Sequence, residues 1–197
     1  MRSSNTKRLV EPNTTLYPVP VVLIACGVGD SINVFSLNRI ASCNAEPPMI
    51  SISVRPQRAS HDLIDKTRSF SVNIPWPEME VVSNFVGTTS MRDLDKWEHV
   101  ALSPVEAQMV SAPLIDECPV NLECQVLEKL TLPSHSLFVA QVIAIHADED
   151  VLNDRHEVDY QLVKGGLTYK AGQVRERPVE NFRPKELLIK AQEWQPK

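Results

Sequence analysis

Five short segments rich in Val, Ile, Phe and Ser constrain the fold of this chain most strongly. They are VVLIACGVG (21–29), MISISV (49–54), SFSVNI (69–74), NLECQVLEKL (121–130) and SLFVAQVIAIHAD (136–148). β-Branched and aromatic residues in runs of this length favour strands. Because few other segments have helical spacing, the chain is predicted to be mainly β, a β-barrel with a few helices, in which closure removes exposed sheet edges.

Apolar residues three or four positions apart predict three helices: SHDLIDKT (60–67), PEMEVVSNFV (77–86) and RPKELLIKAQEW (183–194). Ser60 is a candidate N-cap, since its hydroxyl suits the free backbone N–H groups of a helix start. A single domain is expected over residues 1–197, because a chain of this length buries a sizeable core. Residues 1–14 are expected to form a flexible lead, and residues 175–197 a C-terminal extension with a helix.

Charge and hydropathy argue against several classes of partner. The formal net charge is −5 with both signs spread along the chain, whereas a nucleic-acid partner normally requires a basic face. The longest apolar run, VPVVLIAC (19–26), is far shorter than the ~20 residues of a membrane helix. Residues 1–15 are polar and lack the apolar core of a secretory signal. We therefore expect a cytoplasmic protein with a small-molecule partner and with no nucleic acid or membrane.

Cys118 and Cys124 are interpreted as packing residues. The chain has Cys26, Cys43, Cys118 and Cys124, and no two of them form a CxxC pair. Structural zinc typically needs four Cys or His ligands in short paired spacings, so no metal site is predicted. The period of two in NLECQVLEKL places Cys124 inward in its strand and Glu123 outward. Packing is therefore favoured over a metal clamp or a redox pair.

Residues 32–64 carry most of the chemistry visible in the sequence. Hydroxyl and basic residues follow one strand face and then a predicted helix start: Ser51, Ser53, Arg55, Arg58, Ser60 and His61. Free backbone N–H groups and the dipole at a helix start favour an anion, so a phosphate site is one interpretation. The other is a half-buried strand followed by a capped helix with solvated arginines. The segment alone favours this second interpretation.

Read in order, the motifs resemble the flavin reductase-like family. The similar stretches are residues 18–64, FSVNIP (70–75), GTTSMRDLDKWE (87–98), residues 112–152 and, more weakly, GGLTYKAG (165–172). RASHDLI and GTTSMRDLDKW are most similar to the flavoredoxin-type branch, where RYSHELI and GTVSGRDVDKF are typical. The resemblance implies an FMN-binding split barrel, usually a homodimer, with FMN as cofactor.

The resemblance also implies roles for individual residues. The flavin ring would lie against Asn33, Val34, Phe35, Ser36, Leu37, Asn38 and Arg39. The ribityl chain and phosphate would be held by Ser51, Ser53, Arg55, Arg58, Ser60 and His61. Lys96 and His135 are the candidate catalytic residues, and together with Asp95 they match family positions near the flavin or the subunit boundary.

Three positions depart from the pattern of this branch. The chain reads SLNR where T-x-A-W is common, so Arg39 replaces an aromatic residue. Ala59 stands in place of Tyr, and Met91 in place of Gly. A positive charge at Arg39 near N1 of the flavin would raise the reduction potential, since proteins tune a cofactor through nearby charges.

The resemblance implies an oxidoreductase in which NADH or NADPH delivers hydride to N5 of FMN. The absence of a nucleophile–base–acid set agrees with this, because the isoalloxazine carries the chemistry. A flavoredoxin-type electron-transfer flavoprotein, supplied by a protein partner and without a nicotinamide site, is the alternative. A barrel that has lost flavin and binds another ligand is the third possibility.

Overall fold

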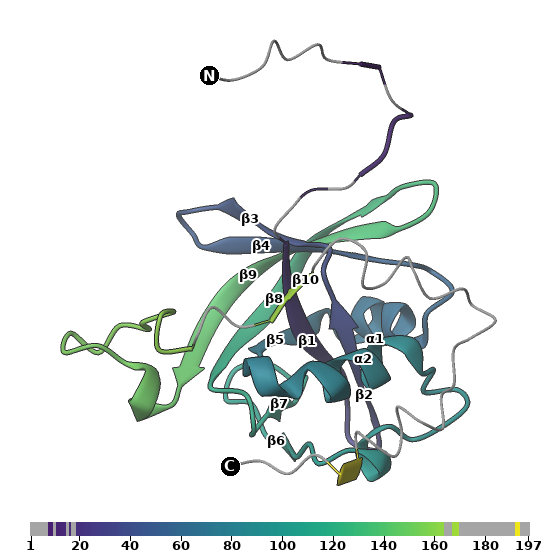
Figure 1. Ribbon diagram of the computed structural model, residues 1–197. Coiled ribbons are helices and arrows are strands. Elements are labelled where there is room, and N and C mark those ends of the chain that lie inside the picture. The colour runs from purple at the N-terminus through teal and green to yellow at the C-terminus, as the bar shows by residue number, and fades with distance from the viewer. Residues whose placement is uncertain are drawn as a thin grey trace.

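The computed structural model describes residues 8–9, 11–14, 16, 19–163, 167–169 and 192–193. An eight-stranded antiparallel sheet has the order β10-β1-β5-β8-β9-β4-β3, with β2 paired to β1 (Figure 1). Its strands are β1 (Val19–Val28), β2 (Ser31–Leu37), β3 (Ile40–Asn44), β4 (Met49–Val54), β5 (Ser69–Ile74), β8 (Val120–Thr131), β9 (Ser136–Ala147) and β10 (Leu167–Tyr169). A small second sheet pairs β6 (Pro104–Val105) with β7 (Leu114–Ile115).

Short helices join and cover these strands. They are α1 (Ala59–Thr67), α2 (Glu80–Thr88) and the 3₁₀ turns η1 (Pro77–Met79), η2 (Trp97–His99) and η3 (Glu149–Val151). The helices predicted over 60–67 and 77–86 correspond to α1 and to η1 with α2. The one predicted over 183–194 lies outside the described residues except for 192–193, as does most of the expected lead and C-terminal extension.

The five predicted strands are confirmed, and β2 and β3 are additional, as are the short strands β6, β7 and β10. The sequences of β2 and β3, SINVFSL and IASCN, mix polar and apolar residues and contain no continuous β-branched run. β3 is largely exposed, and β2 buries only the middle of its length. Pairing with longer neighbours makes them strands, a tertiary effect that local propensity does not report.

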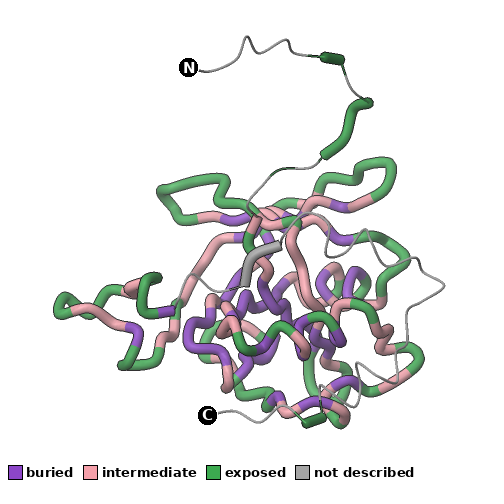
Figure 2. Tube along the Cα trace, in the orientation of Figure 1, coloured by how far each residue is buried: buried purple, intermediate pink, exposed green. Residues whose placement is uncertain are grey.

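The apolar strand β1 is buried on both faces, which explains its uninterrupted apolar sequence. Val22, Ile24 and Cys26 enter a core shared with β4, β5, β8, β9 and Ile64 of α1. Leu23 and Ala25 enter a second core beneath α2. Strands as far apart in the sheet as β1 and β4 share the first core, so the sheet curves around it. Figure 2 shows the buried residues gathered there, with the β3–β4 and β8–β9 hairpin tips exposed.

The packing role is confirmed for Cys118 and Cys124, which are buried. Cys26 is buried as well, whereas Cys43 is exposed on β3. Burial raises the pKa of Cys26 and of Cys124 to about 12, so both remain thiols. Among the described residues, no three His, Cys, Asp or Glu side chains are grouped to hold a metal ion. None of the helices in that part of the chain is long and apolar enough to cross a membrane.

The expectation of an outward Glu123 is wrong, because this side chain is 0% exposed. Its carboxylate accepts hydrogen bonds from the backbone N–H groups of Gln108 (3.0 Å), Met109 (2.6 Å) and Val110 (2.9 Å) and from Nε2 of His146 (2.6 Å). The segment 103–113 therefore crosses β8 and encloses a strand face that period-two alternation assigns to solvent. Burial favours a higher pKa for Glu123, but the hydrogen bonds outweigh it and lower that pKa.

Glu123→Gln should destabilise the fold by about 2–3 kcal/mol at neutral pH, because charge-assisted hydrogen bonds to a buried carboxylate are lost. Since the pKa is lowered, the carboxylate's contribution is present above the ordinary glutamate pKa and is lost as pH falls through the folded-state value. Urea unfolding at neutral and acidic pH measures this, with the exposed Glu128→Gln as the control on the same strand. Equal unfolding free energies for wild type and Glu123→Gln at neutral pH would contradict it.

Candidate functional site

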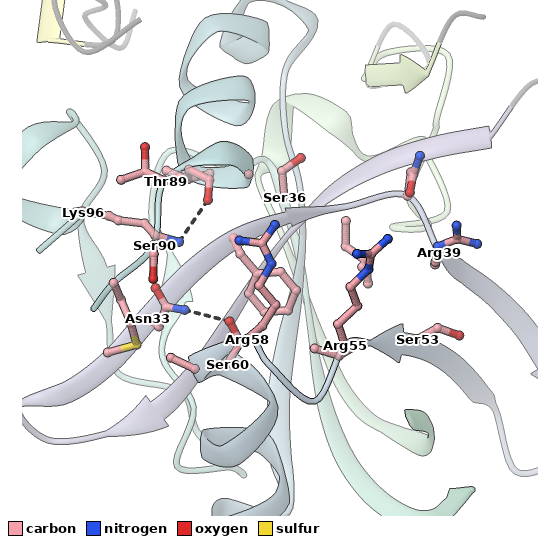
Figure 3. A pocket seen from close by; sticks show the side chains of 18 of the residues that line it. Asn33, Ser36, Arg39, Ser53, Arg55, Arg58, Ser60, Thr89, Ser90 and Lys96 are labelled. Carbon is pink, nitrogen blue, oxygen red and sulfur yellow. Dashed lines mark hydrogen bonds between the residues drawn. The ribbon is translucent and has the colours of Figure 1, made fainter. Parts of the chain in front are cut away.

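A cavity of about 440 Å³ lies between β2, the β4–α1 junction and the segment that follows α2 (Figure 3). This volume falls within the ~300–1,000 Å³ typical of small-molecule sites. The residues of β2 and its exit that line it are Asn33, Phe35, Ser36, Leu37, Asn38 and Arg39. From β4 and the start of α1 come Ser53, Val54, Arg55, Arg58, Ala59 and Ser60. The cavity thus joins segments that the sequence analysis treats as separate parts of a ligand site.

Both candidate catalytic residues, Lys96 and His135, also line the cavity, whereas four other residues singled out from the sequence do not. The side chain of Val34 packs in the core beneath α2, and Ser51 lies 3.5 Å from the carbonyl of Ala41. His61 is buried against Phe138, with its Nε2 3.0 Å from Oγ of Ser136. Asp95 is exposed and accepts a hydrogen bond from the backbone N–H of Trp97.

The start of α1 faces the cavity without a side-chain cap. The N-cap is Arg58, so the expectation that Ser60 caps this helix is wrong. Ser60 lies one residue inside the helix, and its Oγ accepts a hydrogen bond of 2.8 Å from Nδ2 of Asn33. The first N–H groups of a helix have no intrahelical acceptor, and here Ala59 and Ser60 both line the cavity. This end of the cavity therefore favours an anion.

Asn33 contributes an unpaired acceptor. The residue is 3% exposed, and its Oδ1 has no hydrogen-bond partner among the described residues. A buried acceptor without a partner costs roughly 1–3 kcal/mol, so such atoms usually find a donor. Because Asn33 lines the cavity, a ligand N–H or O–H group is a chemically suitable partner.

Lys96 is a buried cation in the cavity wall, 3% exposed. Its Nζ donates hydrogen bonds to the carbonyls of Val34 (2.7 Å) and Val86 (2.9 Å), which joins β2 to α2. The pKa of Lys96 is lowered to about 8, mainly by burial, with a smaller raising effect of Cys26 and a smaller lowering effect of Arg58. An ammonium has three donors, so the two carbonyls leave one for a ligand.

Cations dominate the charge of the cavity. Arg39, Arg55 and Arg58 are exposed, and none of them has an ion-pair partner within the described part of the chain. No Asp or Glu is among the described residues that line the cavity. Guanidinium groups bind phosphate and carboxylate through two parallel N–H donors, so the lining suits an anionic ligand.

Sequence reasoning missed most of the wall formed by the end of α2 and the segment after it, apart from Lys96, a candidate catalytic residue, and Met91, one of the departures from the family pattern. Val86, Gly87, Thr89, Ser90 and Met91 line the cavity there. The signal available was the motif GTTSMRDLDKWE, in which hydroxyl residues follow a helix. A Cβ at Gly87 would lie 2.9 Å from Cβ of Ser36, so glycine lets α2 approach β2 closely. Ala59 and Met91, two of the departures noted in the sequence, face this cavity as well.

The sequence matches the flavin reductase like domain over residues 14–176. The chain belongs to the flavin reductase-like family. A flavoredoxin from Methanosarcina acetivorans has a TM-score of 0.76 at 27% identity, covering 90% of this chain and 97% of that one. An uncharacterised protein of Pyrococcus abyssi is 30% identical over 135 residues, 68% of this chain and 77% of its own. The NADH-dependent flavin reductase StyB of Pseudomonas fluorescens is 23% identical over 148 residues, 71% of this chain and 82% of its own.

These likenesses confirm the split barrel expected from the motifs and the similarity to flavoredoxins. In this member of the flavin reductase-like family, the barrel supplies β2 and β4 as two walls of the cavity. The segment after α2 supplies the third wall.

In this flavin reductase-like protein, Lys96 should titrate near pH 8 because burial disfavours its charged form. Its positive charge is therefore present below pH 8 and lost above it. NMR of protein with ¹³C-labelled lysine measures this, and Lys96→Met identifies the signal by its disappearance. A Lys96 signal that titrates at the ordinary lysine pKa would contradict the burial of the ammonium in the cavity wall.

Proposed function

We propose that the cavity binds FMN and that the protein is an FMN-dependent oxidoreductase reduced by NADH or NADPH. The observation that carries this is the convergence of Lys96, Arg58 and the uncapped start of α1 on a cavity with no lining carboxylate among the described residues. Membership of the flavin reductase-like family and the likeness to a flavoredoxin support it.

The phosphate of FMN would bind at the start of α1. A phosphate monoester carries a charge of about −1.5 to −2 at neutral pH. Arg58 and Lys96 supply positive charge, and the first backbone N–H groups of α1 supply donors. Ser60 is held by Asn33, so the geometry of this end exists before a ligand arrives.

The flavin ring would lie against β2. Phe35, Leu37 and Val54 offer apolar surface, and Oδ1 of Asn33 offers an acceptor that lacks a donor. When bound, the flavin accepts hydride from a reduced nicotinamide and passes the electrons on. The residues of this chain need only bind, orient and partly desolvate the reacting groups.

Lys96 and His135, the catalytic candidates predicted from the sequence, would stabilise charge and orient polar groups at the site. Lys96 places a cation in the wall below pH 8. Burial and the charges of Arg39 and Arg55 lower the pKa of His135, so its imidazole is neutral at pH 7 and can accept or donate one hydrogen bond. Lys96 thus stabilises negative charge, and His135 orients a polar group.

A second candidate is electron transfer from a protein donor, without a nicotinamide site. The likeness to a flavoredoxin at 27% identity favours it. The same cavity would hold the flavin in both cases. The two candidates differ in their reductant alone.

Purified protein mixed with FMN and passed through gel filtration should retain flavin absorbance bands. Arg58→Ala should weaken FMN binding about tenfold, the usual effect of losing a hydrogen bond between charged groups. Arg92→Ala is the control, since Arg92 lies outside the cavity and pairs with Asp62 at 3.8 Å. Steady-state oxidation of NADH and NADPH then separates the reductase from the electron-transfer protein. Wild-type protein that fails to bind FMN would refute both candidates.

A homodimer is the expected assembly. Leu130, Leu137 and Val139 form an apolar patch, because Leu130 pairs with Leu137 across β8 and β9, and Val139 lies two residues on. Leu130 is 56% exposed. The patch adjoins the cavity, since Ser53 pairs with Leu137 across β4 and β9. A second copy would therefore cover this surface next to the ligand.

Light scattering should give the mass of two chains for wild type and of one chain for Val139→Asp, because a charge in an apolar interface is costly to desolvate. Val105→Asp is a control at an exposed apolar position in the small sheet. Wild type with the mass of one chain would contradict the dimer.

A further inference from the structure

The cations of the cavity fall into two groups. Arg58 acts on the charge of Lys96, whereas Arg39 and Arg55 act on His135. In Figure 3, Lys96 and Arg39 lie at opposite ends of the labelled residues, with Arg58 and Arg55 between them. The cavity therefore has one cationic end at Lys96 and the start of α1, and another at Arg39 and Arg55, beside the neutral His135.

One phosphate monoester does not balance both groups. Its charge of about −1.5 to −2 is matched by Arg58 and Lys96 alone. Arg39 and Arg55 then retain two positive charges with no ion-pair partner in the described chain and no lining carboxylate. Like charges in one cavity repel each other, and an anion between them relieves this repulsion.

The backbone fixes Arg39 and Arg55 beside each other. The carbonyl of Arg39 accepts a hydrogen bond of 3.0 Å from the backbone N–H of Ser53, two residues before Arg55. Both side chains start from backbone anchored in the β3–β4 region, while both residues remain exposed. Two guanidinium groups presented from a fixed backbone suit a phosphate or carboxylate.

We propose that Arg39 and Arg55, which the family resemblance would assign to FMN, instead form a second anion subsite with the neutral imidazole of His135 as a hydrogen-bond partner, and that this subsite binds a phosphate or carboxylate group on the substrate that reacts with the flavin. This rests on the proposed function, because the first subsite is assigned to the phosphate of FMN. Two kinds of substrate carry such a group. One is a phosphorylated reductant, NADPH, and the other is an organic acid that accepts electrons.

The subsite is tested with FMN-loaded protein by isothermal titration calorimetry. The ligands are NADP⁺, NAD⁺, benzoate and uncharged benzyl alcohol. The proteins are wild type, Arg39→Ala, Arg39→Lys and the control Arg92→Ala, whose residue lies outside the cavity. FMN affinity and thermal unfolding of each variant show that the first subsite and the fold are intact.

Wild type should bind an anion-bearing ligand roughly tenfold more tightly than its partner without that group, and Arg39→Ala should abolish the difference. Arg39→Lys should restore part of it, and Arg92→Ala should behave as wild type. A difference between NADP⁺ and NAD⁺ identifies a phosphorylated reductant, and one between benzoate and benzyl alcohol identifies an organic acid.

Unchanged ligand affinities in Arg39→Ala would overturn the subsite, while retained FMN would leave the proposed function intact. A loss of FMN affinity in Arg39→Ala equal to that in Arg58→Ala would also overturn it, because Arg39 would then belong to the flavin site. Wild type that binds no FMN would refute the proposed function, and with it the substrate assigned to this subsite.

Discussion

The buried ammonium of Lys96 is the interaction on which the cavity depends. Among the described residues it has no carboxylate partner, and carbonyls of β2 and α2 hold it, so it fixes the distance between these two walls. Removing an ammonium from water is costly, and a lowered pKa is the sign of that cost. An anion in the proposed site would offset this cost, because the ammonium would then have an opposite charge beside it. The fold thus maintains a destabilising charge at the place where a ligand would compensate it.

The sequence predicts five strands of the barrel well because they are short segments rich in β-branched and aromatic residues. β1 is apolar at every position over residues 21–26 because both of its faces are buried. The sequence of this segment alone therefore predicts a strand. β2 and β3 are different. They are strands because of the strands they pair with, and side chains of β2 line a cavity that only the assembled fold encloses.

The errors in predicting individual side chains also arise from contacts with segments far away in the sequence. The period-two pattern assigns Glu123 to solvent, because a pattern within one strand carries no information on the segment 103–113, which lies over β8. A serine at a helix start predicts a cap, but Ser60 is occupied by Asn33, which lies 27 positions earlier in the chain. Motif resemblance brings the right segments to one cavity, but it does not separate Ser53, which lines the cavity, from Ser51, which does not.

The unpaired edge of β2 gives the cavity backbone hydrogen-bonding groups in addition to positive charge. Among the described strands, β2 pairs with β1 alone, so its other edge presents backbone N–H and C=O groups that no strand satisfies. Proteins usually cover or charge such an edge to prevent pairing with another chain. Here Nζ of Lys96 donates a hydrogen bond to the carbonyl of Val34, and the residues of β2 after Val34 line the cavity. A planar ligand with donors and acceptors along one side would satisfy this edge, so the strand that local sequence predicts least well is the one whose backbone is most available for binding.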